Sequence, residues 1–149
     1  KAEFDIDMMH TVRTVNAALP HLEKSQHASI VIVSSVSGRE IDFTTPAYGA
    51  FKAALIHYAH GLAHKLAPKL IRVNSVSPGN VYFKDGIWHY IEQNMPDLFK
   101  SALPLNPTGR MAPAEEIAAG IVFLASPVSS FTMGTNLVID GALTKGVQL

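Results

Sequence analysis

The sequence IVIVSSVSGREIDFTTPAYGAFK, residues 30–52, decides the fold class of this chain. It begins with four β-branched residues without polar alternation, which predicts a strand covered on both faces, as in parallel sheets. Ser34 and Ser35 end this strand, and a loop follows. Pro46 is suited to the first turn of a helix, which we expect from about Thr45 to His64.

Two side chains on the expected helix are suited to proton transfer. Tyr48 and Lys52 are four positions apart, so they lie on one face of the helix. A phenol is a poor acid or base at neutral pH, but a cation within ~4–6 Å stabilises the phenolate. Tyr48 is therefore a candidate proton shuttle. The alternative is that Ser35 caps a turn, while Tyr48 is half-buried and Lys52 is solvated.

The rest of the chain alternates helical and strand patterns, with Pro and Gly between them. The other expected helices cover Phe4 to about Glu23, Ile87 to about Leu98 and Pro113 to about Ala125. The other expected strands cover Leu70–Val76 and Asn136–Ile139. This alternation predicts an α/β fold with a parallel sheet, in which ligands bind at the carboxyl ends of the strands.

Composition restricts the class of protein. The chain has 149 residues, 48% of them hydrophobic, which is enough to bury the core of one domain or part of one. The net charge is zero, which argues against a nucleic-acid partner. There is no cysteine, so disulfides and thiolate metal sites are excluded and a reducing compartment fits. No apolar run reaches the ~20 residues that span a bilayer, so we expect a soluble, cytoplasmic protein without a membrane partner.

The order of Ser35, Tyr48 and Lys52 resembles the active-site signature of the short-chain dehydrogenase/reductase family. Three further segments are similar to the family's sixth strand with its Pro-Gly turn, its last helix and its terminal strand. These are RVNSVSPG (residues 72–79), GRMAPAEEIAAGIVFLAS (residues 109–126) and MGTNLVIDGA (residues 133–142). The resemblance implies that the Tyr is the general acid/base, that the Ser holds the substrate oxygen, and that the Lys binds the nicotinamide ribose and tunes the Tyr.

The resemblance also implies a Rossmann-like doubly wound sheet and an NAD(P)-dependent oxidoreductase. Such an enzyme would transfer a hydride between NAD or NADP and a carbonyl or secondary alcohol. The cofactor-binding residues that it implies are Tyr48, Lys52, Pro78, Gly79, Asn80 and Val81. Family members are usually dimers or tetramers, so we expect a homo-oligomer, in particular a homotetramer.

A glycine-rich phosphate-binding turn, which a dinucleotide site needs, does not occur in residues 1–149. The resemblance begins at the helix before the family's fifth strand. We therefore interpret residues 1–149 as the C-terminal portion of a single Rossmann-type domain, with its last three strands and without the glycine-rich N-terminal half. The first of these strands would then have an unpaired edge. The choice between NAD and NADP depends on the other half.

Two residues depart from the family pattern. The family usually has an Asn in the helix before the serine strand, where a helix distortion lets it hold a water in a relay with the Lys. The matching residue here is Asp7, a candidate catalytic residue whose charge lies near Lys52, or else a solvated Asp. Some family reductases that act on acyl thioesters carry an Asp there. Phe83 stands where a cofactor-binding Thr is common, so cofactor contact would depend on the backbone near Asn80 and Val81.

The segment from Lys84 to Leu103 is expected to select the substrate. Its apolar residues are Ile87, Trp88, Tyr90, Ile91, Met95, Leu98 and Phe99. They predict either a lid over a largely apolar carbonyl or alcohol, or a helix that simply packs against the core.

Three histidines, His57, His60 and His64, share a helix but lack an HExxH pattern or a carboxylate partner. They also face away from Tyr48, so we expect a surface or subunit-contact role and no metal. Two further functions stay open. One is a non-catalytic interaction module. The other is a hydrolase with Ser35 as nucleophile and Lys52 as base, although no GxSxG or SxxK pattern supports it.

Overall fold

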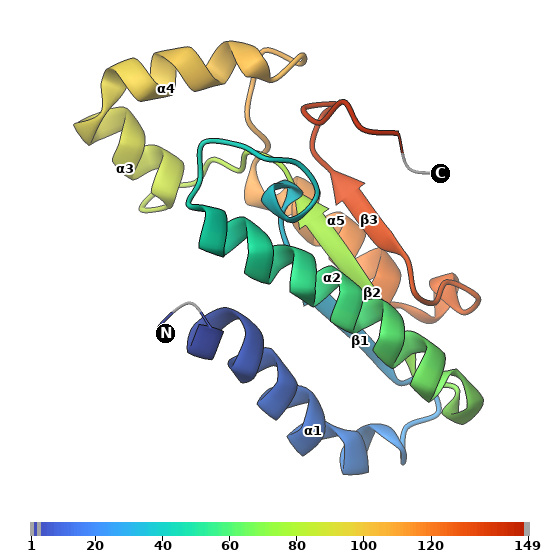
Figure 1. Ribbon diagram of the computed structural model, residues 1–149. Helices are drawn as coiled ribbons and strands as arrows, with labels where there is room; N and C mark the ends of the chain where they lie inside the picture. The colour runs from blue at the N-terminus through green and yellow to red at the C-terminus, as the bar shows by residue number, and fades with distance from the viewer. Residues whose placement is uncertain (1, 3, 148–149) are drawn as a thin grey trace.

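A parallel sheet forms the middle layer of the computed structural model, which describes residue 2 and residues 4–147 (Figure 1). Its strands are β1 (Ser29–Val33), β2 (Arg72–Pro78) and β3 (Asn136–Ile139), in the order β1-β2-β3. Every pair is parallel, with Ile32 opposite Ser75 and Val76 opposite Leu137. The expected α/β fold class with a parallel sheet is confirmed.

Helices cover both faces of this sheet (Figure 1). One face packs against α1 (His10–Leu22) and α2 (Pro46–Leu66), where Val73 joins a core with Leu55 and Ala59. The other face packs against α5 (Ala114–Ala125), where Val76 joins a smaller core. Val73 and Val76 face opposite sides because side chains alternate along a strand.

The expected start of the second strand, Leu70, was wrong. Leu70 has a φ of 56° and lies in the left-handed region at the end of the turn Ala67–Lys69, so the chain is still reversing direction there. The strand instead continues to Pro78, which pairs with Ile139. Proline is tolerated at this end because the next ladder bond comes from the Gly79 N–H to the Ile139 carbonyl, 3.0 Å away.

The first strand is less covered than its apolar run predicts. Ile32 is buried against α1 and α2, but the Val33 side chain is 46% exposed. On the other face the α5 core reaches Val31 and includes no contact with Val33. Among the described residues β1 pairs only with β2, so the expected unpaired edge is present.

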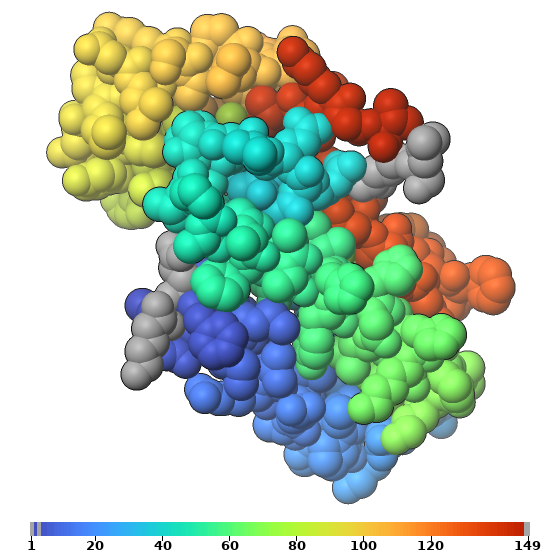
Figure 2. Space-filling model, viewed as in Figure 1, coloured from blue at the N-terminus to red at the C-terminus, as the bar shows by residue number. Residues whose placement is uncertain are grey.

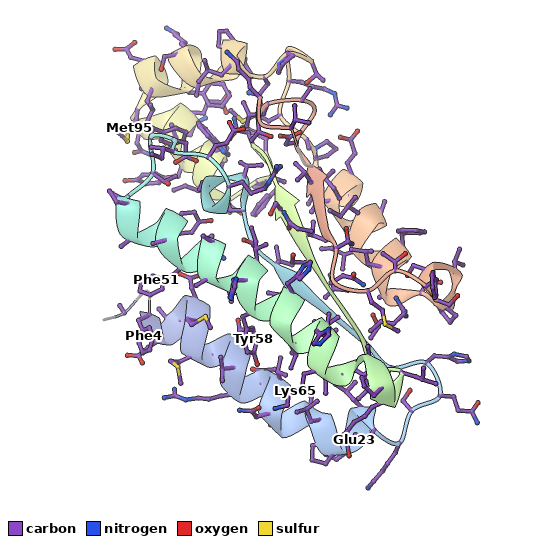
Figure 3. All side chains as sticks on the ribbon, turned by 45° about the vertical axis from the view of Figure 1, so that its right-hand side comes forward. Phe4, Glu23, Phe51, Tyr58, Lys65 and Met95 are labelled. Atoms are coloured by element: carbon purple, nitrogen blue, oxygen red, sulfur yellow. The ribbon has the colours of Figure 1, made fainter. Side chains whose placement is uncertain are left out.

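The first helix begins with a π-helical turn, Phe4–Met9, and continues as α1 without a break at Pro20. The expected helix over this range is therefore confirmed, including the local distortion. The Phe4 ring lies 5.9 Å from the Phe51 ring of α2, which fixes the turn against that helix (Figure 3).

The segment after β2 forms two short helices, α3 (Ile87–Asn94) and α4 (Pro96–Ala102), beyond the carboxyl ends of the strands (Figure 1). In the space-filling view this segment, in yellow, projects from the rest of the molecule (Figure 2). A single helix was expected here. Met95 has an extended φ of −140° before Pro96, because a residue before proline disfavours the helical conformation. The two helices pack around Trp88, Ile91 and Ala102.

The carboxyl end of α5 is held by a buried cation. The Arg72 guanidinium donates hydrogen bonds to the carbonyls of Leu124, Ala125 and Ser126, and to the Ser129 hydroxyl. A cation at this end complements the helix dipole and satisfies carbonyls that lack partners within the helix.

No helix within residue 2 and residues 4–147 is long and apolar enough to cross a membrane. The expected cytoplasmic location stays a prediction.

Candidate active site

The loop after β1 is pressed against the first turns of α2, and two glycines allow this approach. A Cβ at Gly38 would lie 2.6 Å from the carbonyl carbon of Lys52, and a Cβ at Gly49 would lie 2.8 Å from the Ser37 carbonyl oxygen. Ser35 caps the short turn that starts the loop, since its Oγ accepts a hydrogen bond from the Ser37 N–H at 3.1 Å. The strand-end serine is thereby brought beside the helix.

The beginning of α2 sets the positions of the tyrosine and the lysine. The Thr45 side chain caps the helix by accepting a hydrogen bond from the Tyr48 N–H at 3.4 Å, and Pro46 occupies the first turn. The Lys52 Nζ lies 5.4 Å from the centroid of the Tyr48 ring. The prediction that these two residues share a helix face is confirmed.

A cavity of about 500 Å³ opens at the carboxyl ends of β1 and β2, beside the start of α2. Five of the sequence-predicted site residues line it: Ser35, Tyr48, Gly79, Asn80 and Val81. Lys52, Asp7 and Pro78 are not on its wall. The structure therefore brings together the serine, the tyrosine and the turn after β2, with Lys52 beside the tyrosine ring.

Asp7 lies against Lys52 and is not a solvated surface residue. Its Oδ1 is 3.2 Å from the Lys52 Nζ, and the two side chains are only 18% and 14% exposed. Within the π-helical turn the Asp7 carbonyl accepts a hydrogen bond from the Thr11 hydroxyl at 2.9 Å. A π-helical turn shifts a side chain from its usual helical register, and such turns are frequent at functional sites.

The turn after β2 presents unused backbone groups. The Asn80 carbonyl accepts from the Ala112 N–H and the Tyr82 N–H donates to the Ala112 carbonyl, both at 2.9 Å. The intervening residue, Val81, therefore directs its own N–H and C=O away from Ala112. Within residues 4–147 neither group makes a backbone hydrogen bond, although Val81 lines the cavity. One free donor and one free acceptor are available there.

The wall formed by α3 consists of apolar side chains. Ile87, Trp88 and Ile91 line the cavity, and the Phe43 ring meets the Trp88 ring edge-on at 5.4 Å. Two others of the expected apolar group, Tyr90 and Met95, are exposed and lie off the cavity wall. Leu98 and Phe99 pack behind Trp88. The segment thus both lines the cavity and packs a small core of its own.

The opposite wall is polar and was not recognised from the sequence. Ser37, Asp42 and Thr44 all line the cavity. The Ser37 hydroxyl donates to Asp42 Oδ2, and the Thr44 N–H and hydroxyl donate to Asp42 Oδ1 at 2.8 and 2.5 Å. The available signal was position, because all three follow the carboxyl end of a predicted parallel strand.

The Asp42 carboxyl has an altered acidity. Partial burial raises its pKa, but the hydrogen bonds from Ser37 and Thr44 together outweigh this effect and hold the pKa below its usual value. The group is therefore ionised at neutral pH.

The other interpretations of these residues find less support. The Lys52 ammonium pairs with Asp7, and the Ser35 hydroxyl donates to Ser37 Oγ at 3.2 Å, so among the described residues no base is bonded to Ser35. His57, His60 and His64 are exposed on α2. Among the residues that the structure describes, no group of three side chains is arranged to hold a metal ion.

A strand-end serine, a tyrosine beside a lysine and a free backbone pair, at the carboxyl edge of a parallel sheet, place this chain in the class of Rossmann-like α/β proteins. A family model described as enoyl-(acyl carrier protein) reductase matches residues 1–144. The chain belongs to the short-chain dehydrogenase/reductase family.

Three known proteins illustrate this relationship. Isoepoxydon dehydrogenase patN from Penicillium expansum is 43% identical over 99% of this chain and 58% of its own length. An NADP-dependent mannitol dehydrogenase from Hypocrea jecorina is 35% identical over 93% of this chain and 51% of its own length. The NADPH-bound structure of a short chain oxidoreductase from Pseudomonas aeruginosa PAO1, containing an atypical catalytic center, superimposes with a TM-score of 0.86. It is 28% identical and matches 98% of this chain and 57% of that one. The chain thus spans little more than half of each of these proteins.

Proposed function

We propose that this chain forms the catalytic side of an NAD(P)-dependent oxidoreductase that interconverts a carbonyl compound and a secondary alcohol. The observation that carries the proposal is the shared cavity, in which Ser35 and Tyr48 face the turn that includes Val81. Lys52 lies beside the tyrosine, with its Nζ 5.4 Å from the centroid of the ring. The relatives named as dehydrogenases support the same class of reaction.

In this proposal the side chains act on the substrate oxygen. Ser35 turns its hydroxyl from Ser37 to the substrate and holds the oxygen by a hydrogen bond. Tyr48 donates a proton to the same oxygen in the reducing direction and accepts one in the oxidising direction. Bound NAD(P) supplies or accepts the hydride at the substrate carbon.

The cavity wall suits the nicotinamide end of the cofactor. A carboxamide carries both a donor and an acceptor, which match the free C=O and N–H of Val81. Gly79 and Asn80 lie on the same wall, and Pro78 ends the strand before them. Phe83 replaces the common Thr and contributes no hydroxyl. Its ring instead covers Gly86, where a Cβ would lie 2.8 Å from Phe83 Cζ.

We further propose that residues 1–149 act with a glycine-rich half that binds the pyrophosphate. The relatives that the chain matches are nearly twice as long, and the edge of β1 offers unpaired backbone groups to a further parallel strand. The cofactor can be NAD or NADP, because the mannitol dehydrogenase and the Pseudomonas structure are described with NADP or NADPH, whereas a similar reductase structure from Brucella melitensis is described with bound NAD.

Asp7 is proposed as a positioning residue for Lys52. Its carboxylate fixes the ammonium from the side of the π-helical turn, so the lysine can hold the ribose without swinging into solvent. Asp7 does not reach the cavity wall, so it acts through Lys52 and does not touch the substrate.

Two further features complete the proposal. The α3 wall with Trp88 and Ile91 supports a substrate that has an apolar part. The exposed histidine face of α2, with His57, His60 and His64, supports a contact between copies in a dimer or tetramer.

Replacement of Tyr48 by Phe tests the proposal in the complete protein that carries this chain. NADPH-dependent ketone reduction should fall at least about 10³-fold, because the proton donor is lost. NADPH binding, followed by its fluorescence, should persist. Tyr90→Phe is the matched control, since Tyr90 is exposed on α3 away from the cavity. Full activity of Tyr48→Phe would contradict the proposal.

A further inference from the structure

The polar wall of the cavity carries a charged group that the proposed reaction does not use, the Asp42 carboxylate. It is joined to the candidate substrate-holding serine through one intermediate residue. Ser35 Oγ donates to Ser37 Oγ at 3.2 Å, and the Ser37 hydroxyl donates to Asp42 Oδ2. The carboxylate therefore lies two hydrogen bonds from Ser35, on the same wall.

The Asp42 carboxylate has acceptor capacity left. An ionised carboxylate offers about four lone-pair positions, and its oxygens only accept. Thr44 fills Oδ1 with two donors, and Ser37 occupies one position on Oδ2. The hydrogen bonds that hold the Asp42 carboxylate come from Ser37 and Thr44. One position on Oδ2 therefore stays available on an exposed side chain of the cavity wall.

The charge of this group determines what it can bind there. A carboxylate accepts a hydrogen bond from a hydroxyl but repels a carboxylate or phosphate on the substrate. The loop contacts that hold Asp42 ionised also fix its orientation, because Oδ1 is tied to both the N–H and the hydroxyl of Thr44. The polar wall thus presents a fixed acceptor beside the carbonyl-binding position.

We propose that Asp42 is a specificity-determining residue that selects uncharged hydroxy ketones, and the corresponding diols, by accepting a hydrogen bond from a second substrate hydroxyl. This inference rests on the proposed oxidoreductase function and names its substrate class. The carbonyl oxygen binds between Ser35 and Tyr48, and the second hydroxyl, on an adjacent or next carbon, donates to Asp42. Trp88 and Phe43 cover the carbon skeleton from the apolar wall.

The test compares reduction of 2-hydroxycyclohexanone and cyclohexanone by the complete protein with NADPH. The wild type should favour the hydroxy ketone by at least about tenfold in kcat/KM, because a hydrogen bond to a charged group discriminates strongly. Asp42→Asn should reduce this preference about tenfold, mainly through KM. Thr44→Val should retain the preference, since it removes one donor to Oδ1 but keeps the carboxylate.

Glu40→Gln is the matched control for charge. Glu40 lies on the same loop and accepts a hydrogen bond from the Gly146 N–H at 2.6 Å, but it is not on the wall of this cavity. This variant should retain the preference for the hydroxy ketone. Loss of the preference in Glu40→Gln as well would assign the effect to the charge of the loop and overturn the role of Asp42.

Other outcomes would contradict the inference. Equal kcat/KM for the two ketones, or a preference that Asp42→Asn retains, would overturn it while reduction itself remains. An equal loss for both ketones in Asp42→Asn would show that Asp42 only orders the loop. Absence of any ketone reduction with either NADPH or NADH would instead overturn the proposed function, and this inference with it.

Discussion

The two walls of the cavity are built in different ways. On the α2 side, close backbone contacts at Gly38 and Gly49 and a partly buried ion pair with Asp7 hold Ser35, Tyr48 and Lys52 in place. On the α3 side, the wall depends on packed aromatic rings around Trp88. Close backbone contacts tolerate almost no change, whereas an apolar cluster tolerates substitutions of similar volume. The positions of Ser35, Tyr48 and Lys52, the proposed reacting groups, are therefore rigidly specified, while the α3 wall, which we propose to contact the substrate, is open to variation.

Removal of the Lys52 ammonium, which pairs with Asp7, should give the largest loss of unfolding free energy. Lys52→Met leaves the partly buried Asp7 carboxylate without its partner, which costs about 2–3 kcal/mol of unfolding free energy. Urea denaturation at neutral pH measures this loss. The double variant Asp7→Asn/Lys52→Met should recover much of it, because no charge is then left unpaired.

An exposed ion pair provides the control for that loss. Lys69 and Glu23 form a salt bridge with side chains that are 54% and 43% exposed. Lys69→Met should change the unfolding free energy by less than about 1 kcal/mol. Similar losses for Lys52→Met and Lys69→Met would show that the Asp7–Lys52 pair stabilises the fold no more than an exposed ion pair.

Substitution of Gly38 should give the next largest loss of unfolding free energy, because the loop lies so close to α2 there. Gly38→Ala places a methyl group 2.6 Å from the backbone of Lys52, so either the loop or α2 must move. We expect a loss of about 1–3 kcal/mol in unfolding free energy, together with a loss of activity as Ser35 shifts from Tyr48.

Gly61→Ala is the matched control on α2, since a Cβ there would point into open space. Thermal unfolding should show stabilisation by about 0.5–1 kcal/mol, the usual preference for Ala in a helix. Destabilisation by both substitutions would mean that helix α2, and not the loop contact, is sensitive.

Trp88→Phe should have a smaller effect, a change of KM, because it alters only the α3 wall of the cavity. The smaller ring leaves part of the space beside Phe43 and Phe99 unfilled but keeps the cluster apolar. Steady-state kinetics with a cyclic ketone should show a change of KM by about tenfold or less, with NADPH affinity preserved. A loss of NADPH binding would place the cofactor against α3 and contradict the division of roles between the walls.

The pH dependence of stability should show the smallest effect. Because the pKa of Asp42 is lowered in the folded state, its stabilising contribution is complete above the unfolded value of ~3.9 and is lost as pH falls through the lower folded value. The stability difference between wild type and Asp42→Asn should therefore shrink in acid. Urea midpoints at neutral pH and near pH 3 measure it, and a difference that grows in acid would have the wrong sign.

Local patterns predicted much of this structure. The apolar run before Ser34 gave a strand, and the spacing of Tyr48 and Lys52 gave a shared helix face, because both depend on near neighbours. The resemblance indicated the position of Asp7 and a helix distortion there. It also placed the charge of Asp7 near Lys52, which the ion pair confirms. Local patterns alone do not predict this contact, because it depends on how the π-helical turn Phe4–Met9 packs against α2.

Other features depend on contacts that the sequence does not display. The polar wall at Asp42 forms only when Gly38 meets the backbone of α2, which folds the loop over the sheet edge. The exposure of Val33 follows from the edge position of β1, and an apolar run alone does not reveal which strand is at the edge.

Hydride transfer tests most directly whether Ser35, Tyr48 and the Val81 turn form one reaction site. The complete protein is given a ketone and NADPH deuterated at either face of the nicotinamide C4, and the alcohol is analysed by mass spectrometry. We expect one of the two labelled cofactors to transfer its deuterium to the carbinol carbon, and Tyr48→Phe to produce almost no labelled alcohol. Unlabelled alcohol from both cofactors, or undiminished labelling by Tyr48→Phe, would contradict it.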